Sequence, residues 1–270
     1  MDPIIGITCF CNLGKRNTDE TPYYRVSRNY IEPIIKCGGI PFIIPVFSDK
    51  NLSEKILDII DGLFLTGGSG STTKCDRIEV KERPRTLRGL DEKRYIADQY
   101  LIKAAMKRNI PLLGICRGMQ MICETAGGKL SYKFLDEIDT GGVLHRQESS
   151  GNIPTHIISL EENSQLQRIL GVPEIKVNSF HHQFCIEPGK NFKASAWAKN
   201  GIIEAIESPV FRFALGLQFH PEKMFNDYPV FIKIFKAFVD KCREYQNLKK
   251  LKLFSKKRRI FDIYVVLILC

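Results

Sequence analysis

The sequence has no recognisable secretory leader and no disulfide framework. Its first residues contain no basic stretch followed by an apolar one, as a secretory signal would. The nine cysteines are odd in number and show no repeated C-x-x-C spacing, which excludes the pattern of a small secreted scaffold. A cytoplasmic location is therefore expected, with most cysteines acting as small buried apolar residues. Cys9 and Cys11 form a C-x-C pair that no second pair supports, so no metal site is predicted there.

No apolar run is long enough for a membrane span. The apolar end of the chain, within residues 260–270, is far shorter than the roughly 20 residues required. It follows a basic stretch, and residues 246–270 carry seven basic and one acidic residue, a net +6 of the chain's +10. The body keeps only +4, which gives little reason to expect a nucleic-acid partner. A docked strand or a poorly ordered extension is preferred for this tail over contact with a membrane surface.

There is also no Ser/Gly-rich linker and no internal repeat, so one domain over residues 1–245 is predicted, followed by the tail at 246–270. Short apolar runs alternate with helical patterns, which is typical of an α/β fold. We expect a flavodoxin-like three-layer sandwich, with a mostly parallel central sheet, helices on both faces and extra antiparallel strands in the C-terminal half. The early strands are expected at 4–8, 40–45, 62–66 and 110–115, and the helices at 24–36, from Ser53, at 91–108, from Arg117 and at 228–245.

The segment Gly114-Ile115-Cys116-Arg117-Gly118 has the G-x-nucleophile-x-G form of an elbow between a strand and a helix. The glycines permit a tight turn that lifts Cys116 to the helix N-terminus. There the helix dipole favours the reactive thiolate. Taken alone, the segment also fits a buried cysteine in an ordinary strand–helix turn.

A nucleophilic cysteine needs a base, and the base needs an orienting group. Both occur in His220-Pro221-Glu222, at the end of an apolar run. Pro221 disfavours helix at His220, so we expect an extended backbone that places His220 and Glu222 on one side. A surface turn is the alternative for this segment taken alone.

A third segment, Thr66-Gly67-Gly68-Ser69, follows another apolar strand. Its glycines allow backbone N–H groups to point at a developing oxyanion, and the amide of Arg117 is the natural second donor. Because ligands of open α/β sheets bind beyond the carboxyl ends of the strands, the three segments together predict one active site.

These residues resemble known signatures. Gly114-Ile-Cys-Arg-Gly-Met-Gln120 and Gln218-Phe-His-Pro-Glu222 are similar to the two motifs of class I glutamine amidotransferases. Val177-Asn-Ser-Phe-His-His-Gln183 more narrowly resembles the γ-glutamyl-γ-aminobutyrate hydrolase group, peptidase family C26. The similarity covers residues 3 to 240 and excludes the tail.

The resemblance implies Cys116 as nucleophile, His220 as base and then acid, and Glu222 as its orienter. Gly68 and Arg117 would supply the oxyanion-hole amides, with no metal or organic cofactor. The pocket for a small γ-glutamyl substrate would be lined by Gly67, Gln120, Asn178, Ser179, His181 and Gln183. His181 and His182 fit packing roles equally well, and the oligomeric state, a homodimer included, is left open.

Three positions depart from the pattern of the group. Ser69-Gly70-Ser71-Thr72 lacks the usual acidic residue, Tyr95 stands where an acidic residue is usual, and Asn200 replaces the Asp of an Asp-Gly turn. The first two lie on the loop and helix expected to cover the site, so they leave the specificity for the leaving group open. The prediction is hydrolysis of a γ-glutamyl amide through a thioester. The alternatives are a glutaminase or amidotransferase that passes ammonia to a separate synthase, and a non-catalytic binding protein.

Overall fold

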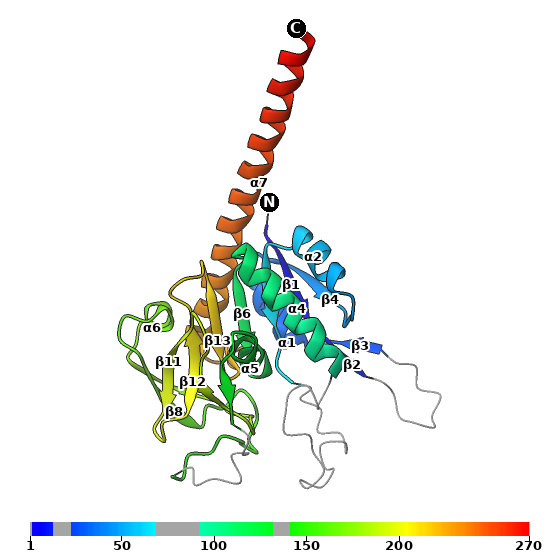
Figure 1. The fold of residues 1–270 in the computed structure, drawn as a ribbon. Helices are drawn as coiled ribbons and strands as arrows, with labels where there is room; N and C mark the ends of the chain where they lie inside the picture. Colours follow the sequence, from blue (N-terminus) through cyan, green and yellow to red (C-terminus); the bar gives the residue numbers. More distant parts are fainter. Residues whose placement is uncertain (1, 13–22, 69–91, 132–140, 270) are drawn as a thin grey trace, which may run out of the picture.

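The computed structural model describes residues 2–12, 23–68, 92–131 and 141–269, with the backbone alone at 11–12 and 252–269. Its centre is an eleven-stranded sheet (Figure 1). Five of the strands are parallel and lie in the order β4 (Ile40–Ile44), β1 (Ile4–Thr8), β5 (Gly62–Leu65), β6 (Leu112–Ile115) and β13 (Ala214–Leu217). Active-site segments were expected after three of these strands.

The sheet continues antiparallel beyond β13. The next strands are β12 (Ile203–Glu207), β11 (Lys193–Ala198), β8 (His156–Leu160) and β9 (Glu174–Val177). Two short strands, β7 (Lys129–Leu130) and β10 (Cys185–Glu187), pair beside β12. A separate two-stranded sheet joins β2 (Phe10–Asn12) to β3 (Tyr23–Arg25). The predicted α/β fold, with its antiparallel C-terminal half, is confirmed.

Helices cover both faces of the parallel half. One core contains side chains of α1 (Arg28–Lys36) and α7 (Ile232–Leu269), and the other those of α2 (Lys50–Ile59), α4 (Glu92–Arg108) and α5 (Arg117–Thr125). Along β5, Phe64 packs into the first core and Leu63 and Leu65 into the second, since successive side chains of a strand point to opposite faces. A short helix, α6 (Gln165–Leu170), packs against α7.

Two helices begin at residues other than those predicted. The helix α2 starts at Lys50 because the Asp49 carboxylate accepts a hydrogen bond from the Asn51 amide at 2.8 Å. Ser53, the predicted cap, lies inside the helix. The helix α1 starts at Arg28 rather than near residue 24 because Tyr23–Arg25 forms strand β3. In both cases the residue that caps the helix, Asp49 or Ser27, lies a few positions from the predicted start.

The last helix is longer than predicted. It was expected to end at Tyr245, but α7 continues to Leu269 and its C-terminal part extends away from the sheet (Figure 1). Of the two forms expected for the tail, a docked strand and a poorly ordered extension, the docked strand is therefore wrong. The reason lies in the sequence, because no glycine or proline interrupts residues 232–269. A search of the described helices for one long and apolar enough to cross a membrane finds none.

Candidate active site

Cys116 occupies the tight turn between β6 and α5, and its backbone is strained. Its φ is 52° and its ψ is −106°, outside the regions that L-residues favour. Among the described residues, the other three non-glycine residues with positive φ are all asparagines. Two backbone bonds fix the turn: the Cys116 N–H donates to the Leu217 carbonyl at 2.6 Å, and the Cys116 carbonyl accepts from Gln120 at 3.1 Å. Such strain persists where the surroundings hold it, often at functional sites.

The glycines beside Cys116 are required by close packing. A Cβ on Gly118 would lie 2.3 Å from the carbonyl oxygen of Leu65, and one on Gly114 would lie 2.7 Å from the backbone of Gly118. Strand β5 and helix α5 therefore approach backbone to backbone. This contact brings the turn after β5 beside the start of α5.

His220 and Glu222 follow β13 and form a short ion pair. The distance from His220 Nδ1 to Glu222 Oε1 is 2.7 Å, and both side chains are buried. The extended backbone predicted for this segment is wrong beyond His220. Pro221 instead opens a 3₁₀ turn, Pro221–Lys223, since its fixed φ suits a first helical position. The turn bends Glu222 back onto the imidazole.

Cys116 and His220 meet beside Gly67. A Cβ on Gly67 would lie 3.1 Å from His220 Cε1 and 3.6 Å from Cys116 Cβ. Burial lowers the pKa of His220, but the negative charges of Glu222 and the Cys116 thiolate raise it, to about 9. His220 Nε2 makes no well-aligned hydrogen bond within the described part of the chain. Such bonds often tighten only when substrate binds. The environment therefore favours the imidazolium form of His220 beside Cys116.

The Gly67-Gly68 turn contacts Tyr30, a residue to which no motif in the sequence pointed. The Gly67 N–H donates to the hydroxyl of Tyr30 at 3.1 Å. Burial and then the negative charges of Glu222 and Cys116 raise the pKa of Tyr30, so this hydroxyl stays protonated. Gly68 is exposed, with open space where a Cβ would lie. The Arg117 amide is in the first turn of α5, where backbone N–H groups have no acceptor within the helix.

A cluster of buried charged side chains holds the Gly67-Gly68 turn in place. The Arg94 guanidinium donates to the carbonyls of Gly67 and Thr66 at 3.0 and 2.9 Å. Asp98 lies 3.6 Å from Arg94 and also accepts a hydrogen bond from the Arg117 side chain. The cluster therefore links the turn after β5 to the residue that follows the nucleophile. No motif in the sequence pointed to it.

Gln120 and Gln183 lie close together, as the predicted substrate pocket requires. The Gln120 side chain donates to the Gln183 carbonyl at 2.8 Å and to the Gln218 side chain at 3.1 Å. The Gln183 side chain donates to the Ser131 carbonyl at 3.2 Å. These bonds tie α5 to the loop at 178–183. Their contact with substrate stays a prediction.

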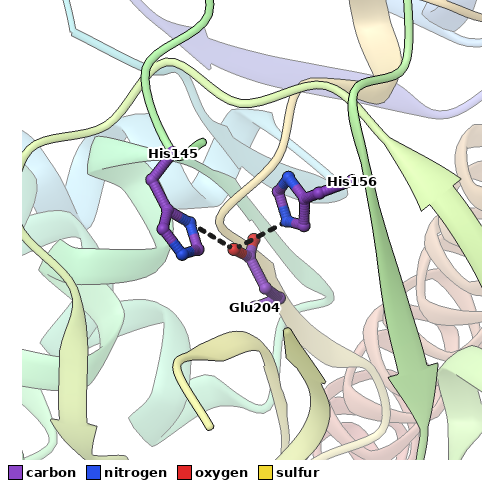
Figure 2. Close-up of side chains that lie close together, drawn as sticks. All are labelled: His145, His156 and Glu204. Carbon is purple, nitrogen blue, oxygen red and sulfur yellow. Dashed lines mark hydrogen bonds and ion pairs between the residues drawn. The ribbon is translucent and has the colours of Figure 1, made fainter. Parts of the chain in front are cut away.

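His181 belongs to a second polar cluster. Its Nε2 lies 3.5 Å from a carboxylate oxygen of Glu204, which also lies near His145 and His156 (Figure 2). Burial lowers the pKa of His181, more than the charge of Glu204 raises it. Burial raises the pKa of Glu204, but the three imidazoles lower it, and the result is well below the usual range. Glu204 is therefore a buried carboxylate anion.

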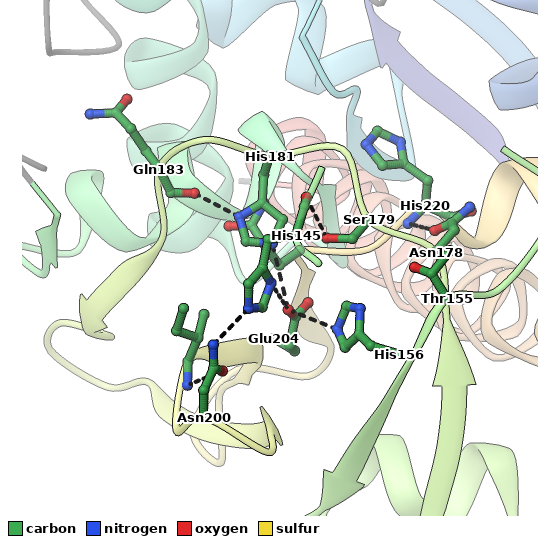
Figure 3. Close-up of polar contacts among 12 residues, drawn as sticks. His145, Thr155, His156, Asn178, Ser179, His181, Gln183, Asn200, Glu204 and His220 are labelled. Atoms are coloured by element: carbon green, nitrogen blue, oxygen red, sulfur yellow. Dashed lines mark hydrogen bonds and ion pairs between the residues drawn. The ribbon is translucent and has the colours of Figure 1, made fainter. Parts of the chain in front are cut away.

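Asn178 and Ser179 are also engaged within the protein (Figure 3). Asn178 binds the backbone of His220 through both atoms of its amide. The Ser179 N–H donates to the Gln147 side chain at 2.8 Å, and its hydroxyl donates to the His145 carbonyl at 2.8 Å. The loop that carries both residues is thus fastened to the strand end that presents His220.

The three positions that depart from the sequence pattern of the group differ in their surroundings. Tyr95 is buried, and its hydroxyl accepts a hydrogen bond from Gln99 at 2.9 Å. Asn200 contacts His145 and precedes Gly201, whose φ of 81° fits the predicted turn. Residues 69–72 lie outside the described residues. The Cys9 thiol donates to the Ile44 carbonyl at 3.1 Å, and the Cys11 side chain is not described.

The fold is that of glutamine amidotransferase and glutaminase domains. A Thermoplasma acidophilum protein, provisionally named as a component of GMP synthase, matches with a TM-score of 0.57 and 18% identity, over 93% of this chain and 98% of the other. A glutaminase domain of Trypanosoma brucei CTPS, with bound acivicin, matches with a TM-score of 0.53 and 17% identity, over 88% and 94%. At these identities the likeness concerns the fold alone.

The chain belongs to the peptidase C26 family, whose model matches residues 3–222. A Rickettsia prowazekii protein, named provisionally as glutamine amidotransferase-like, is 30% identical over 88% of this chain and 96% of its own length. The γ-glutamyl-γ-aminobutyrate hydrolase of Escherichia coli is 28% identical over 90% of this chain and 95% of its own length. The family resemblance seen in the sequence is confirmed.

Proposed function

We propose that this chain is a cysteine hydrolase that cleaves a γ-glutamyl amide bond. The observation that carries the proposal is the position of His220. Its Nδ1 lies 2.7 Å from Glu222 Oε1, and its ring and the Cys116 side chain both lie beside Gly67. This is the relation among nucleophile, base and orienting group that covalent catalysis needs. The family, which includes hydrolases of γ-glutamyl amides, supports it.

The proposed reaction has two steps. The Cys116 thiolate attacks the γ-carbonyl carbon, and the amides of Gly68 and Arg117 stabilise the oxyanion. The C–N bond breaks as the His220 imidazolium gives its proton to the leaving amine, which leaves a γ-glutamyl thioester. Water then attacks the thioester and gives a proton to His220, and the C–S bond breaks to release glutamate and restore the thiolate. Glu222 orients the imidazole through Nδ1 in both steps.

The substrate in this proposal is γ-glutamyl-γ-aminobutyrate or a similar substituted amide. The named activity of the Escherichia coli relative supports this class. Residues Gly67, Gln120 and Gln183 remain the proposed lining of the γ-glutamyl pocket. A cytoplasmic location is part of the proposal, and none of the six cysteines whose side chains the structure describes forms a disulfide, which agrees with a reducing compartment.

A glutaminase that delivers ammonia to a separate synthase is the second candidate. The provisional name of the Rickettsia relative and the fold shared with a glutaminase domain favour it. The isolated chain would then act on glutamine alone, or only with a synthase present. A chain that acts unaided on substituted amides supports the hydrolase.

The test is glutamate release by the purified chain and its Cys116→Ala variant from a panel of γ-glutamyl amides that includes glutamine. We expect release from substituted amides by the natural chain and none above background by the variant. Release that survives Cys116→Ala would overturn the mechanism. Release from glutamine alone would favour the second candidate.

A further inference from the structure

Three of the chain's five histidines surround one buried carboxylate. Glu204 Oε1 lies 3.2 Å from His145 Nδ1, 3.2 Å from His156 Nε2 and 3.5 Å from His181 Nε2 (Figure 2, Figure 3). The four side chains are at most 7% exposed. The proposed catalytic steps use none of them.

The cluster joins four separate parts of the chain. His156 begins β8 and Glu204 lies within β12. His145 comes from the segment before β8, and His181 from the loop at 178–183. Residues that converge from four segments onto one point, deep in the protein, need a strong attraction at that point to offset the loss of their hydration.

Hydrogen bonds account for only part of the cluster. His156 Nε2 makes a hydrogen bond to Glu204, but His145 Nδ1, His181 Nε2 and Glu204 Oε2 are buried and make no well-aligned hydrogen bond within the described residues. His181 Nδ1 faces the Gln183 carbonyl at 3.0 Å, so this nitrogen carries the proton. A singly protonated His181 ring would then present the Nε2 lone pair to a carboxylate oxygen. A cation between them would turn this repulsion into attraction.

The distances from Glu204 to the imidazole nitrogens are close to the edge of a metal tetrahedron, and the ligand atoms of His145, His156 and Glu204 lie within 4.8 Å of one another. Zinc binds imidazole nitrogen and carboxylate oxygen at about 2.0–2.2 Å, so its ligands in a tetrahedral site lie roughly 3.3 Å apart. The three separations between nitrogen and oxygen are 3.2, 3.2 and 3.5 Å. We propose that His145, His156, His181 and Glu204 bind one Zn²⁺ ion.

The set of donors favours zinc over the hard cations. Three imidazole nitrogens and one carboxylate suit Zn²⁺, whereas Ca²⁺ and Mg²⁺ prefer oxygen ligands. With four protein ligands the site is closed, so the ion has a structural role. It would fasten the loop at 178–183 to β8 and β12. That loop also carries Asn178, which binds the backbone of His220.

Asn200 supplies a second contact around the ion. Its side-chain amide lies 3.0 Å from His145 Nε2. When Nδ1 of His145 binds a metal, Nε2 carries the proton and needs an acceptor. The Asn200 amide meets this need through its oxygen after a half-turn, which gives up the 3.4 Å bond that this oxygen accepts from the Ile202 N–H. An aspartate at this position would accept the same bond more strongly.

The experiment measures metal content and coordination. The chain is purified without a histidine tag, stripped with a chelator and reloaded with Zn²⁺ or Co²⁺. We expect one equivalent of bound Zn²⁺ and, with Co²⁺, the intense visible absorption of tetrahedral coordination. Cys116→Ala and His182→Gln should keep both signals, since neither residue belongs to the cluster. His181→Gln and Glu204→Gln should each bind Zn²⁺ at least tenfold more weakly, and Asn200→Asp more tightly than the natural chain.

If a variant does not fold, the natural chain alone still tests the zinc site. Stripping should lower its melting temperature, and one equivalent of Zn²⁺ should restore it. Less than a tenth of an equivalent of bound metal after reloading, with an unchanged melting temperature, would overturn the site. Retention of the Co²⁺ spectrum in a folded Glu204→Gln variant would overturn it as well. Loss of metal with an intact Cys116 reaction would leave the proposed hydrolase standing.

Discussion

The side chain of Asn178 holds both backbone polar groups of His220. Its oxygen accepts from the His220 N–H at 2.8 Å, and its amide nitrogen donates to the His220 carbonyl at 3.0 Å. Both residues are buried. The pair connects the loop at 178–183 to the end of β13, so the imidazole is positioned by a residue that need not touch the substrate.

Replacing Asn178 with Ala should therefore impair catalysis more than binding. Two buried hydrogen bonds are lost, at about 1–3 kcal/mol for each group left unpaired. We expect kcat to fall by about tenfold or more, with a smaller change in KM. Steady-state kinetics on a γ-glutamyl amide measures this. Asn152→Ala, which removes an exposed bond to Asp227, is the matched control, and equal losses in the two variants would contradict a positioning role.

Activity should decline at alkaline pH through His220. Its pKa is raised to about 9, so the imidazolium that protonates the leaving amine persists up to that pH and is lost above it. Glu222→Gln removes a negative charge that raises this pKa, and the alkaline decline should move to lower pH. The pH profile of kcat is the measurement. A profile in Glu222→Gln that matches the natural chain above pH 7 would exclude this role for Glu222.

The raised pKa of His220 also makes the free energy of unfolding depend on pH. The pKa of His220 in the folded chain is about 9, above the roughly 6.5 expected when unfolded. Its contribution is therefore fully present below about pH 6.5 and is lost as the pH rises through 9. Denaturant unfolding at pH 6 and pH 10 should show a larger loss for the natural chain than for Glu222→Gln. An equal loss in both would refute the linkage.

Gly118→Ala should destabilise the fold. Its Cβ would lie 2.3 Å from the Leu65 carbonyl oxygen, a backbone atom that cannot simply turn aside. Overpacking of this kind costs about 1–3 kcal/mol, which corresponds to a fall in Tm of roughly 3–10 °C for a chain of this size. Gly68→Ala, with nothing within 4 Å of the new atom, should leave Tm nearly unchanged. Calorimetry compares them, and similar melting temperatures would show that β5 and α5 can separate.

Asp98→Asn should destabilise the chain strongly. It leaves Arg94 and Arg117 buried without their shared carboxylate, and breaking a buried pair costs about 3–5 kcal/mol. The isosteric change Glu32→Gln, at an exposed pair with Arg28, should change stability by less than about 0.5 kcal/mol. Urea unfolding of both variants tests this. A small effect of Asp98→Asn would mean that water reaches the guanidinium groups.

Much of the fold was predictable because local signals agreed. The apolar runs that became β5 and β6 are followed by the Gly67-Gly68 turn and by the elbow cysteine, and both strands are buried in a parallel sheet. The length of α7 was missed although the sequence contained the signal, since no glycine or proline follows Pro229. The short strands β7 and β10 were missed because two or three residues show no periodicity.

The meeting of the three strand ends was also predictable, since each had a turn or elbow signal after an apolar run. Tyr30 and Arg94 were not. Their partners lie 37 and 27 positions away, and a tyrosine or arginine in a helix has no pattern that identifies such a bond. The histidines around Glu204 were missed for the same reason, because they are spread from residue 145 to residue 204 without a short ligand spacing.

Trapping the thioester tests the central claim most directly. The natural chain is mixed with a γ-glutamyl amide, quenched in acid within one turnover and digested for mass spectrometry. The account predicts one γ-glutamyl group on the peptide that contains Cys116, formed more slowly in His220→Ala and absent in Cys116→Ala. Rapid release of glutamate with no adduct on that peptide at any quench time would contradict it.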